Sequence, residues 1–160
     1  MVELCRAAVP SIRLGDWSVA SDGSLLRTLL GSCVGLALHD RRLKVGGLAH
    51  IVLPNSRGNT DRPGKFADTA VPSLIKQMED HAGQKLTLTA KIAGGASMFA
   101  TTSTVGIGLQ NLQSCEQVLA TLGIRVVAKH CGGEQGRRMT LDTVDGAVLI
   151  EIVGQGPIKL

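Results

Sequence analysis

Aromatic residues are scarce in this sequence: Trp17, Phe66 and Phe99 make up 2% of its 160 residues, and there is no tyrosine. Proteins that bind RNA or single-stranded nucleic acid stack bases on exposed aromatic rings. The shortage therefore argues against that class of function. Hydrophobic residues still make up 44% of the chain, so the core of the folded protein must be aliphatic.

Long apolar segments are also missing. None approaches the roughly 18 consecutive apolar residues of a transmembrane helix, and we expect no membrane insertion. The N-terminal segment contains Glu3, Arg6 and Pro10 in place of the apolar stretch of a secretory signal peptide. We therefore expect a cytoplasmic protein, in which cysteines are kept reduced. The four cysteines are Cys5, Cys33, Cys115 and Cys131.

Positive charge is only slightly in excess, with a net charge of +4. Two short basic clusters, residues 41–44 and Arg137-Arg138, do not resemble a DNA recognition helix. We therefore predict no nucleic-acid partner and interpret both clusters as solvated turns. The alternative is an electropositive surface that attracts an acidic protein partner. His39 and His81 lie in charged segments and are expected at the surface.

Short aliphatic segments bounded by glycine, proline or charge predict strands. They cover residues 34–38, 45–53, 86–93, 124–129, 139–141 and 147–153, and a further strand is expected within 11–20. Apolar residues at three- and four-residue spacing predict helices over 67–78 and 107–122, and Gly123 ends the second. Pro72 fits the first helix only within its first turn.

The chain is expected to form one domain over residues 1–160, because no linker, repeat or low-complexity segment divides it. Asp145-Gly146 predicts a two-residue type I′ hairpin turn between the last two strands. Strands that alternate with helices and end in a hairpin are typical of an α/β layered sandwich with a mixed β-sheet.

The segment Gly31-Ser32-Cys33-Val34-Gly35 is the strongest candidate for chemistry. Its glycines permit a tight turn with exposed N–H groups, which stabilise a thiolate and an oxyanion. His50 ends the next extended segment. If the two segments form a hairpin with its turn centred between Arg41 and Arg42, Cys33 and His50 lie directly opposite, with Cβ atoms about 5 Å apart. A thiol and an imidazole at that distance form a nucleophile–base pair.

The same residues also have a purely structural interpretation. Cys33 can be a small buried hydrophobic residue and His50 a hydrogen-bonded core histidine. Cys115 lies on the apolar stripe of its helix and is expected in the core. No cysteine or histidine spacing fits a structural zinc site. Residues 94–97 lack the signature of a phosphate loop and are expected to line a pocket.

Further short motifs accompany these two segments over residues 12 to about 153. The full set is Leu30-Gly31-Ser32-Cys33-Val34, Gly46-Gly47-Leu48-Ala49-His50, Leu53-Pro54, Thr60-Asp61, Lys65-Phe66-Ala67-Asp68, Lys91-Ile92-Ala93-Gly94-Gly95-Ala96-Ser97-Met98-Phe99, Ile107-Gly108-x-x-Asn111 and Gly132-Gly133-x-x-Gly136-Arg137. As an ordered set over nearly the whole chain, they resemble the CheD family, the chemoreceptor glutamine deamidases.

This resemblance implies an activity, a fold and partners. The family hydrolyses glutamine side chains of methyl-accepting chemotaxis receptors to glutamate, and some members also hydrolyse receptor glutamate methyl esters. We expect a cysteine thioester intermediate and no metal or organic cofactor. The implied fold is a three-layer α/β/α sandwich, similar to the catalytic domain of cytotoxic necrotizing factor toxins. The implied partners are the receptors and a CheC-type phosphatase.

The resemblance also assigns the catalytic residues. Cys33 matches the nucleophile of the family, and His50 matches its general base. Thr28 is the candidate for the third catalytic residue. Thr28 lies one position nearer to the cysteine than the threonine does in the family motif. Without a gap between the two sequences, Arg27 would occupy the position of that threonine.

Two other functions stay open. Residues 31–35 also fit the G-x-nucleophile-x-G elbow of other cysteine hydrolases, although the histidine of that fold comes late in the sequence and His50 follows Cys33 by only 17 positions. The second is a non-catalytic adaptor of the chemotaxis array that binds receptors or the phosphatase. Asp61 and Asp68 are candidates for an acidic group that orients His50.

Overall fold

The computed structural model describes residues 9–97 and 106–160, which form two β-sheets and two α-helices. One sheet contains β1 (Trp17–Ala20), β3 (Val34–Asp40), β4 (Val45–Ile51), β5 (Thr89–Gly94) and β6 (Arg125–Cys131). The other contains β2 (Leu25–Leu30), β7 (Arg137–Asp142), β8 (Val148–Glu151) and β9 (Ile158–Lys159). The helices are α1 (Ala67–Ala82) and α2 (Ile107–Thr121), and a short 3-10 helix, η1 (Pro63–Lys65), precedes α1.

The first sheet has the strand order β1-β4-β3-β5-β6, and the second has the order β2-β7-β8-β9. In the described part of the chain, β5 and β6 pair in parallel and the other pairs of named strands are antiparallel. The first sheet is therefore mixed, as the sequence predicts. The α/β class is confirmed with it.

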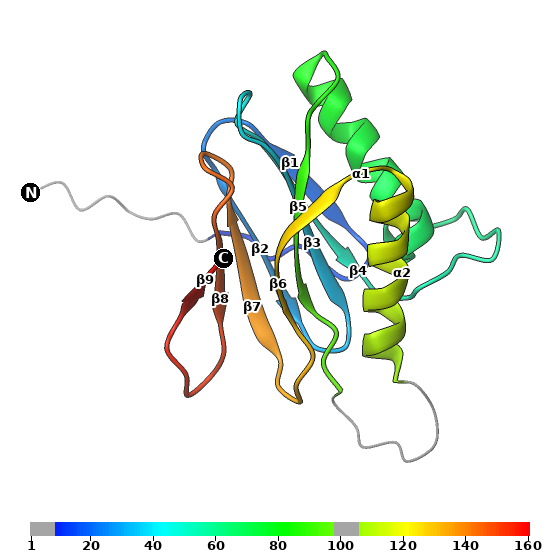
Figure 1. Ribbon diagram of the computed structural model, residues 1–160, viewed down its shortest axis with the longest axis vertical. Coiled ribbons are helices and arrows are strands. Elements are labelled where there is room, and N and C mark those ends of the chain that lie inside the picture. The colour runs from blue at the N-terminus through cyan, green and yellow to red at the C-terminus, as the bar shows by residue number, and fades with distance from the viewer. Residues whose placement is uncertain (1–8, 98–105) are drawn as a thin grey trace, which may run out of the picture.

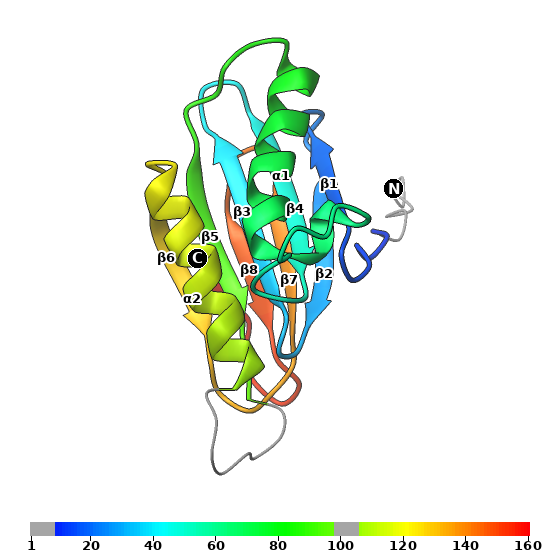
Figure 2. The same ribbon diagram turned by 90° about the vertical axis from the view of Figure 1, so that its right-hand side faces the viewer.

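Both helices cover one face of the five-stranded sheet, and the four-stranded sheet covers the other face (Figures 1 and 2). Each interface has its own aliphatic core. Leu36 of β3 and Leu74 of α1 belong to the core beneath the helices. Leu48 of β4 and Met139 of β7 belong to the core between the two sheets. The order of layers is thus helices, mixed sheet, antiparallel sheet.

The α/β/α order expected from the sequence is wrong for the described residues, because a sheet replaces the second helical layer. β2 and β9, which both belong to that sheet, are not predicted from the sequence. In β2, Leu26, Thr28 and Leu30 are buried while Leu25 and Leu29 are exposed. Leucines on both faces hide the two-residue period from which a strand is recognised. The similarity to the toxin domain stays a prediction.

Two turns differ from their predicted form. The loop between β3 and β4 has its four residues at 41–44, where the Asp40 carboxylate accepts the Leu43 N–H at 2.9 Å and Lys44 has a positive φ of 54°. The loop between β7 and β8 spans residues 143–147, and within it only Gly146 has a positive φ, of 77°. A type I′ turn needs positive φ at both central residues, so that prediction is wrong.

Both predicted helices are confirmed. Gly123, which follows α2, has the left-handed φ of 71° that ends a helix. Pro72 lies inside α1, which begins at Ala67, and so falls in its second turn. The expectation of a first-turn position is wrong, and the helix tolerates one missing N–H donor instead. None of the helices in the described residues is long and apolar enough to span a bilayer.

Every residue of β3 and β4 is buried, because each strand is covered on both faces. Successive side chains of a strand point to opposite faces. Val34 of β3 and Ala49 of β4 pack beneath the helices, so Gly35 and His50 face the second sheet. His39 also faces that sheet, and its Nε2 donates to the carbonyl oxygen of Thr143 at 2.9 Å. The prediction that His39 lies at the surface is therefore wrong.

Candidate active site

The β3–β4 hairpin brings Cys33 and His50 to the same face, but not directly opposite each other. His50 pairs with Gly35, and Val34 pairs with Ile51. The predicted register is therefore wrong by two residues, since the turn is centred one residue later than assumed. A shift of two residues keeps every side chain on its original face. Cys33, one residue before β3, lies diagonal to His50, a relationship that spans about 7–8 Å in an antiparallel pair.

Thr28 of β2 lies against His50 across the interface between the two sheets. The hydroxyl oxygen of Thr28 is 2.6 Å from Nδ1 of His50, and the same hydroxyl donates to the carbonyl oxygen of Ile12 at 2.8 Å. Thr28 is fully buried, and His50 is nearly so. The structure therefore brings together two of the three residues that the resemblance assigns to catalysis.

This hydrogen-bond chain determines which nitrogen of His50 carries the proton. A hydroxyl has one hydrogen to donate, and that of Thr28 goes to Ile12. The contact between Thr28 and His50 must then be a bond from Nδ1–H of the imidazole to the hydroxyl oxygen. In the neutral ring Nε2 is therefore the unprotonated nitrogen, and it is buried with no hydrogen-bond partner among the described residues. Its lone pair is available as a base.

Arg27, which occupies the ungapped position of the family motif, has a different environment. Its Nε donates to the hydroxyl of Thr140 on β7 at 3.2 Å. Since neighbouring residues of a strand point to opposite faces, Arg27 points away from the interface that holds His50. The structure thus favours Thr28 over Arg27 as the partner of the histidine.

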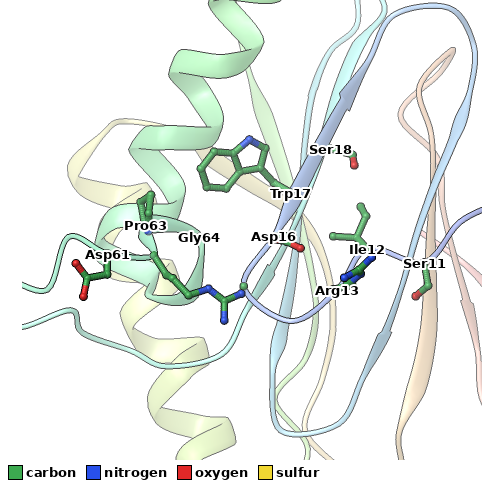
Figure 3. Close-up of a pocket in the computed structure, with 11 residues that line it drawn as sticks. Ser11, Ile12, Arg13, Asp16, Trp17, Ser18, Asp61, Pro63 and Gly64 are labelled. Atoms are coloured by element: carbon green, nitrogen blue, oxygen red, sulfur yellow. The ribbon is translucent and has the colours of Figure 1, made fainter.

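The backbone around His50 is held by the segment that precedes β1. The His50 N–H donates to the carbonyl of Asp16, and the Gly15 N–H donates to the carbonyl of His50. The same segment lines a cavity of about 450 Å³ that also contains Trp17 and Asp61 (Figure 3). Asp61 lies at the edge of this cavity, with its carboxylate pointing away from Asp16 and Trp17 (Figure 3). Asp68 accepts two hydrogen bonds from Ser56. The prediction that an acidic group orients His50 is replaced by the contact with Thr28.

Burial favours the uncharged forms of Cys33 and His50. It raises the pKa of the Cys33 thiol and lowers the pKa of the His50 imidazole. Both shifts have the same cause, since a low-dielectric environment disfavours the charged form of each group. The pair is therefore held as a thiol and a neutral imidazole.

The turn that carries Cys33 is held by all three of its carbonyl groups. The carbonyl of Gly31 accepts from the Ala96 N–H at 3.0 Å, and that of Cys33 accepts from the Gly95 N–H at 2.9 Å. The carbonyl of Ser32 accepts from the Asn111 side chain at 3.1 Å. In a trans peptide the N–H points opposite to the carbonyl. The N–H groups of Ser32 and Cys33 therefore point away from Ala96 and Asn111, which donate to the carbonyls of the same two peptide units.

The end of β5 and the loop that follows it fit closely around this turn. A Cβ at Gly94, which has φ of 100°, would overlap the Cys33 carbonyl oxygen. A Cβ at Gly108 of α2 would lie 2.6 Å from the carbonyl oxygens of Gly95 and Ala96. Both positions therefore require glycine. Two N–H groups of residues 94–97 support the turn that bears the cysteine, and a pocket lined by these residues stays a prediction.

A second cavity, of about 870 Å³, borders the same turn at Gly31. Arg137 and Arg138 also line it. Arg137 is buried, and its guanidinium donates to the carbonyl of His130 at 2.7 Å, while Arg138 pairs with Glu151 at 2.8 Å. This basic cluster is therefore not a solvated turn, whereas Arg41, Arg42 and Lys44 of the other cluster are exposed as expected.

The remaining cysteines lie away from His50 or outside the described residues. Cys115 is fully buried beneath the helices, as predicted, and burial raises its pKa to about 12. Cys131 is half-buried, and its Sγ lies 3.5 Å from the carbonyl oxygen of Ile92. Cys5 and the motif residue Phe99 lie outside the described part of the chain.

Comparison with known proteins identifies the family. A family model described as CheD chemotactic sensory transduction matches residues 52–152. A Clostridium botulinum protein named "Probable chemoreceptor glutamine deamidase CheD" is 48% identical over 147 residues, which cover 89% of this chain and 91% of the relative. The chain belongs to the CheD family. A Methanococcus maripaludis protein of the same name is 42% identical over 144 residues, which cover 89% of this chain and 94% of the length of the relative.

The matches to the CheD relatives extend over the segments that carry the candidate site. The family model begins at Val52, after Thr28, Cys33 and His50. The CheD protein of Desulforamulus reducens is 41% identical over 155 residues and covers 93% of this chain and 93% of its own. A match of that extent includes all three positions wherever it begins. Asn111, which contacts the turn that carries Cys33, had no role assigned from the sequence, although it belongs to one of the CheD motifs.

Proposed function

We propose that this protein hydrolyses the side-chain amide of glutamine residues on chemoreceptors and releases ammonia. One observation carries the proposal: the Thr28–His50 hydrogen bond leaves the lone pair of Nε2 free on the face of the sheet that also carries Cys33. The printed name of the CheD relatives supplies the substrate class. The receptor surface that presents the glutamine is expected to lie in the cytoplasm.

The first half of the reaction forms a thioester. Nε2 of His50 accepts the thiol proton of Cys33 as Sγ attacks the side-chain carbonyl carbon of the glutamine. The oxyanion that develops accepts hydrogen bonds from the N–H groups of Ser32 and Cys33, where loss of one such donor costs about 3 kcal/mol of barrier. Protonated His50 then gives its proton to the departing amine, which leaves as ammonia.

The second half restores the enzyme. His50 accepts a proton from water, and the resulting hydroxide attacks the thioester carbonyl. The tetrahedral intermediate expels the Cys33 thiolate, which regains its proton from His50. The product is glutamate. The same steps hydrolyse a glutamate methyl ester, with methanol as the first leaving group, and they require only the side chains and N–H groups of this site.

Mass spectrometry of a receptor cytoplasmic fragment tests the proposal. Incubation with the wild-type protein is expected to convert particular glutamines to glutamates, which changes the mass of the peptides that contain them. Binding to the fragment without any such change would establish the adaptor function instead. Turnover of small esters without change at receptor glutamines would point to a different cysteine hydrolase. A CheC-type phosphatase as a partner stays a prediction.

Replacement of Thr28 tests the orientation of His50. Thr28→Val keeps the shape of the side chain and removes the hydroxyl, so Nδ1–H of His50 loses its acceptor. We expect kcat for glutamine conversion to fall about 10- to 100-fold, less than the roughly 10⁴-fold loss caused by removing a charged orienting carboxylate from a serine protease triad. Thr28→Ser keeps the hydroxyl and is expected to retain most of the activity. Equal rates for the two variants would contradict this role.

A further inference from the structure

Asn111 of α2 joins the two halves of the candidate site. Its side-chain Nδ2 donates to the carbonyl oxygen of Ser32 at 3.1 Å and to that of Val52 at 2.9 Å. Ser32 directly precedes the nucleophile, and Val52 lies two residues after His50. Asn111 is fully buried, and both of its hydrogen bonds are partly buried. One amide group thus contacts both chain segments that carry the reacting side chains.

These two bonds lie where the β3–β4 ladder ends. The last pair of the ladder is Val34 with Ile51, and Cys33 and Val52 lie one step beyond it. The Val52 N–H donates to Lys65 rather than to the segment before β3. The Asn111 amide therefore takes the place of the next rung and holds together two segments that no longer pair with each other.

Burial of the Asn111 side-chain amide lowers the stability of the folded protein. Its two N–H hydrogens have acceptors, but Oδ1 is buried and finds no donor among the described residues. A buried acceptor without a partner destabilises the folded state. An apolar side chain of similar volume would avoid that penalty, but it could not bridge the carbonyls of Ser32 and Val52.

We propose that Asn111 is a positioning residue, whose amide fixes Cys33 relative to His50. This inference rests on the proposed function, and it predicts an effect on turnover rather than on substrate binding. Asn111 touches the carbonyls behind the turn, whereas Sγ of Cys33 and the N–H groups proposed for the oxyanion are the groups that meet the substrate. A displacement of about 1 Å in a reacting group can lower the rate about 100-fold.

The test compares Asn111→Leu with Ser114→Ala. Ser114 lies one turn further along α2 and also donates to a carbonyl of the segment after β4, that of Pro54 at 2.6 Å, without contacting the turn that carries Cys33. We expect Asn111→Leu to lower kcat about 100-fold with KM within about 2-fold, and Ser114→Ala to leave both nearly unchanged. Asn111→Ala serves as a second variant if leucine does not fit.

A second measurement does not depend on deamidase activity. The N–H groups of Gly95 and Ala96 donate to the carbonyls of Cys33 and Gly31, so their hydrogen exchange reports how firmly the turn is held. We expect exchange there to accelerate at least 10-fold in the Asn111 variants and not in Ser114→Ala. Unchanged exchange overturns the proposal, and so does faster exchange with wild-type kcat. If the wild-type protein leaves receptor glutamines intact, the proposed function fails, and exchange alone then decides whether Asn111 holds the turn.

Discussion

Replacement of Cys33 by alanine is expected to abolish the conversion of receptor glutamines while the protein stays folded. The thiol is the group proposed to form the covalent intermediate, and no other cysteine of the described residues lies beside His50. Loss of a nucleophile of this kind lowers kcat by about 10³-fold or more. Ammonia release and the mass of receptor peptides measure the activity, and circular dichroism with thermal unfolding measures the fold.

Cys131→Ala is the matched control for this prediction. Cys131 is half-buried in β6, and its thiol lies against the carbonyl of Ile92 rather than against a base. The control is expected to keep the wild-type rate. Full turnover by Cys33→Ala would contradict the thioester mechanism. Equal losses in the two variants would instead mean that the fold, and not the nucleophile, has been damaged.

Replacement of His50 is expected to be almost as damaging. Nε2 of His50 is the group proposed to accept the thiol proton of Cys33, and burial already raises the pKa of that thiol. We expect kcat for glutamine conversion to fall about 10³-fold or more in His50→Ala. Since His50 is buried, the alanine variant leaves a cavity, and His50→Gln is the variant that keeps more of the volume. Activity close to wild type in His50→Gln would contradict its role as the base.

The pH dependence of kcat/KM tests the protonation state of His50 independently. Burial lowers its pKa below the ordinary value for imidazole, about 6.5. The neutral, basic form therefore persists to lower pH than in an exposed histidine. We expect the acid limb of the kcat/KM profile to lie below pH 6.5 or so in the wild-type protein, and to be absent from His50→Gln. A wild-type acid limb above that pH would contradict a buried neutral base.

The central hairpin and the two helices could be predicted from sequence because their signals are local. β3 and β4 are continuous apolar segments bounded by charge, and the helices carry apolar residues at helical spacing. The pairing of Cys33 and His50 on one face followed from alternation along the strands. The diagonal register did not follow, since it depends on how many residues the turn uses, and that is decided by the Asp40 carboxylate and the positive φ of Lys44.

The groups that surround the reacting pair could not be predicted from periodicity. The hydroxyl of Thr28 reaches His50 only because the second sheet packs on the first, and β2 was not recognised as a strand. The bridge from Asn111 depends on α2 lying across the ends of β3 and β4. The acceptor of the Thr28 hydroxyl is a backbone carbonyl, which no side-chain pattern reveals. Tertiary packing supplies each of these contacts.

The strand that carries Thr28 also determines when the site can become active during synthesis. β2 pairs with β7, whose residues Arg137–Asp142 come more than a hundred positions later in the chain. A nascent chain can therefore form the β3–β4 hairpin, with Cys33 and His50 in place, long before the partner of β2 has left the ribosome. Until β7 arrives, the imidazole has no fixed hydroxyl to orient it. The histidine proposed as the base for Cys33 therefore acquires its hydroxyl partner only after the whole of β7 has been synthesised.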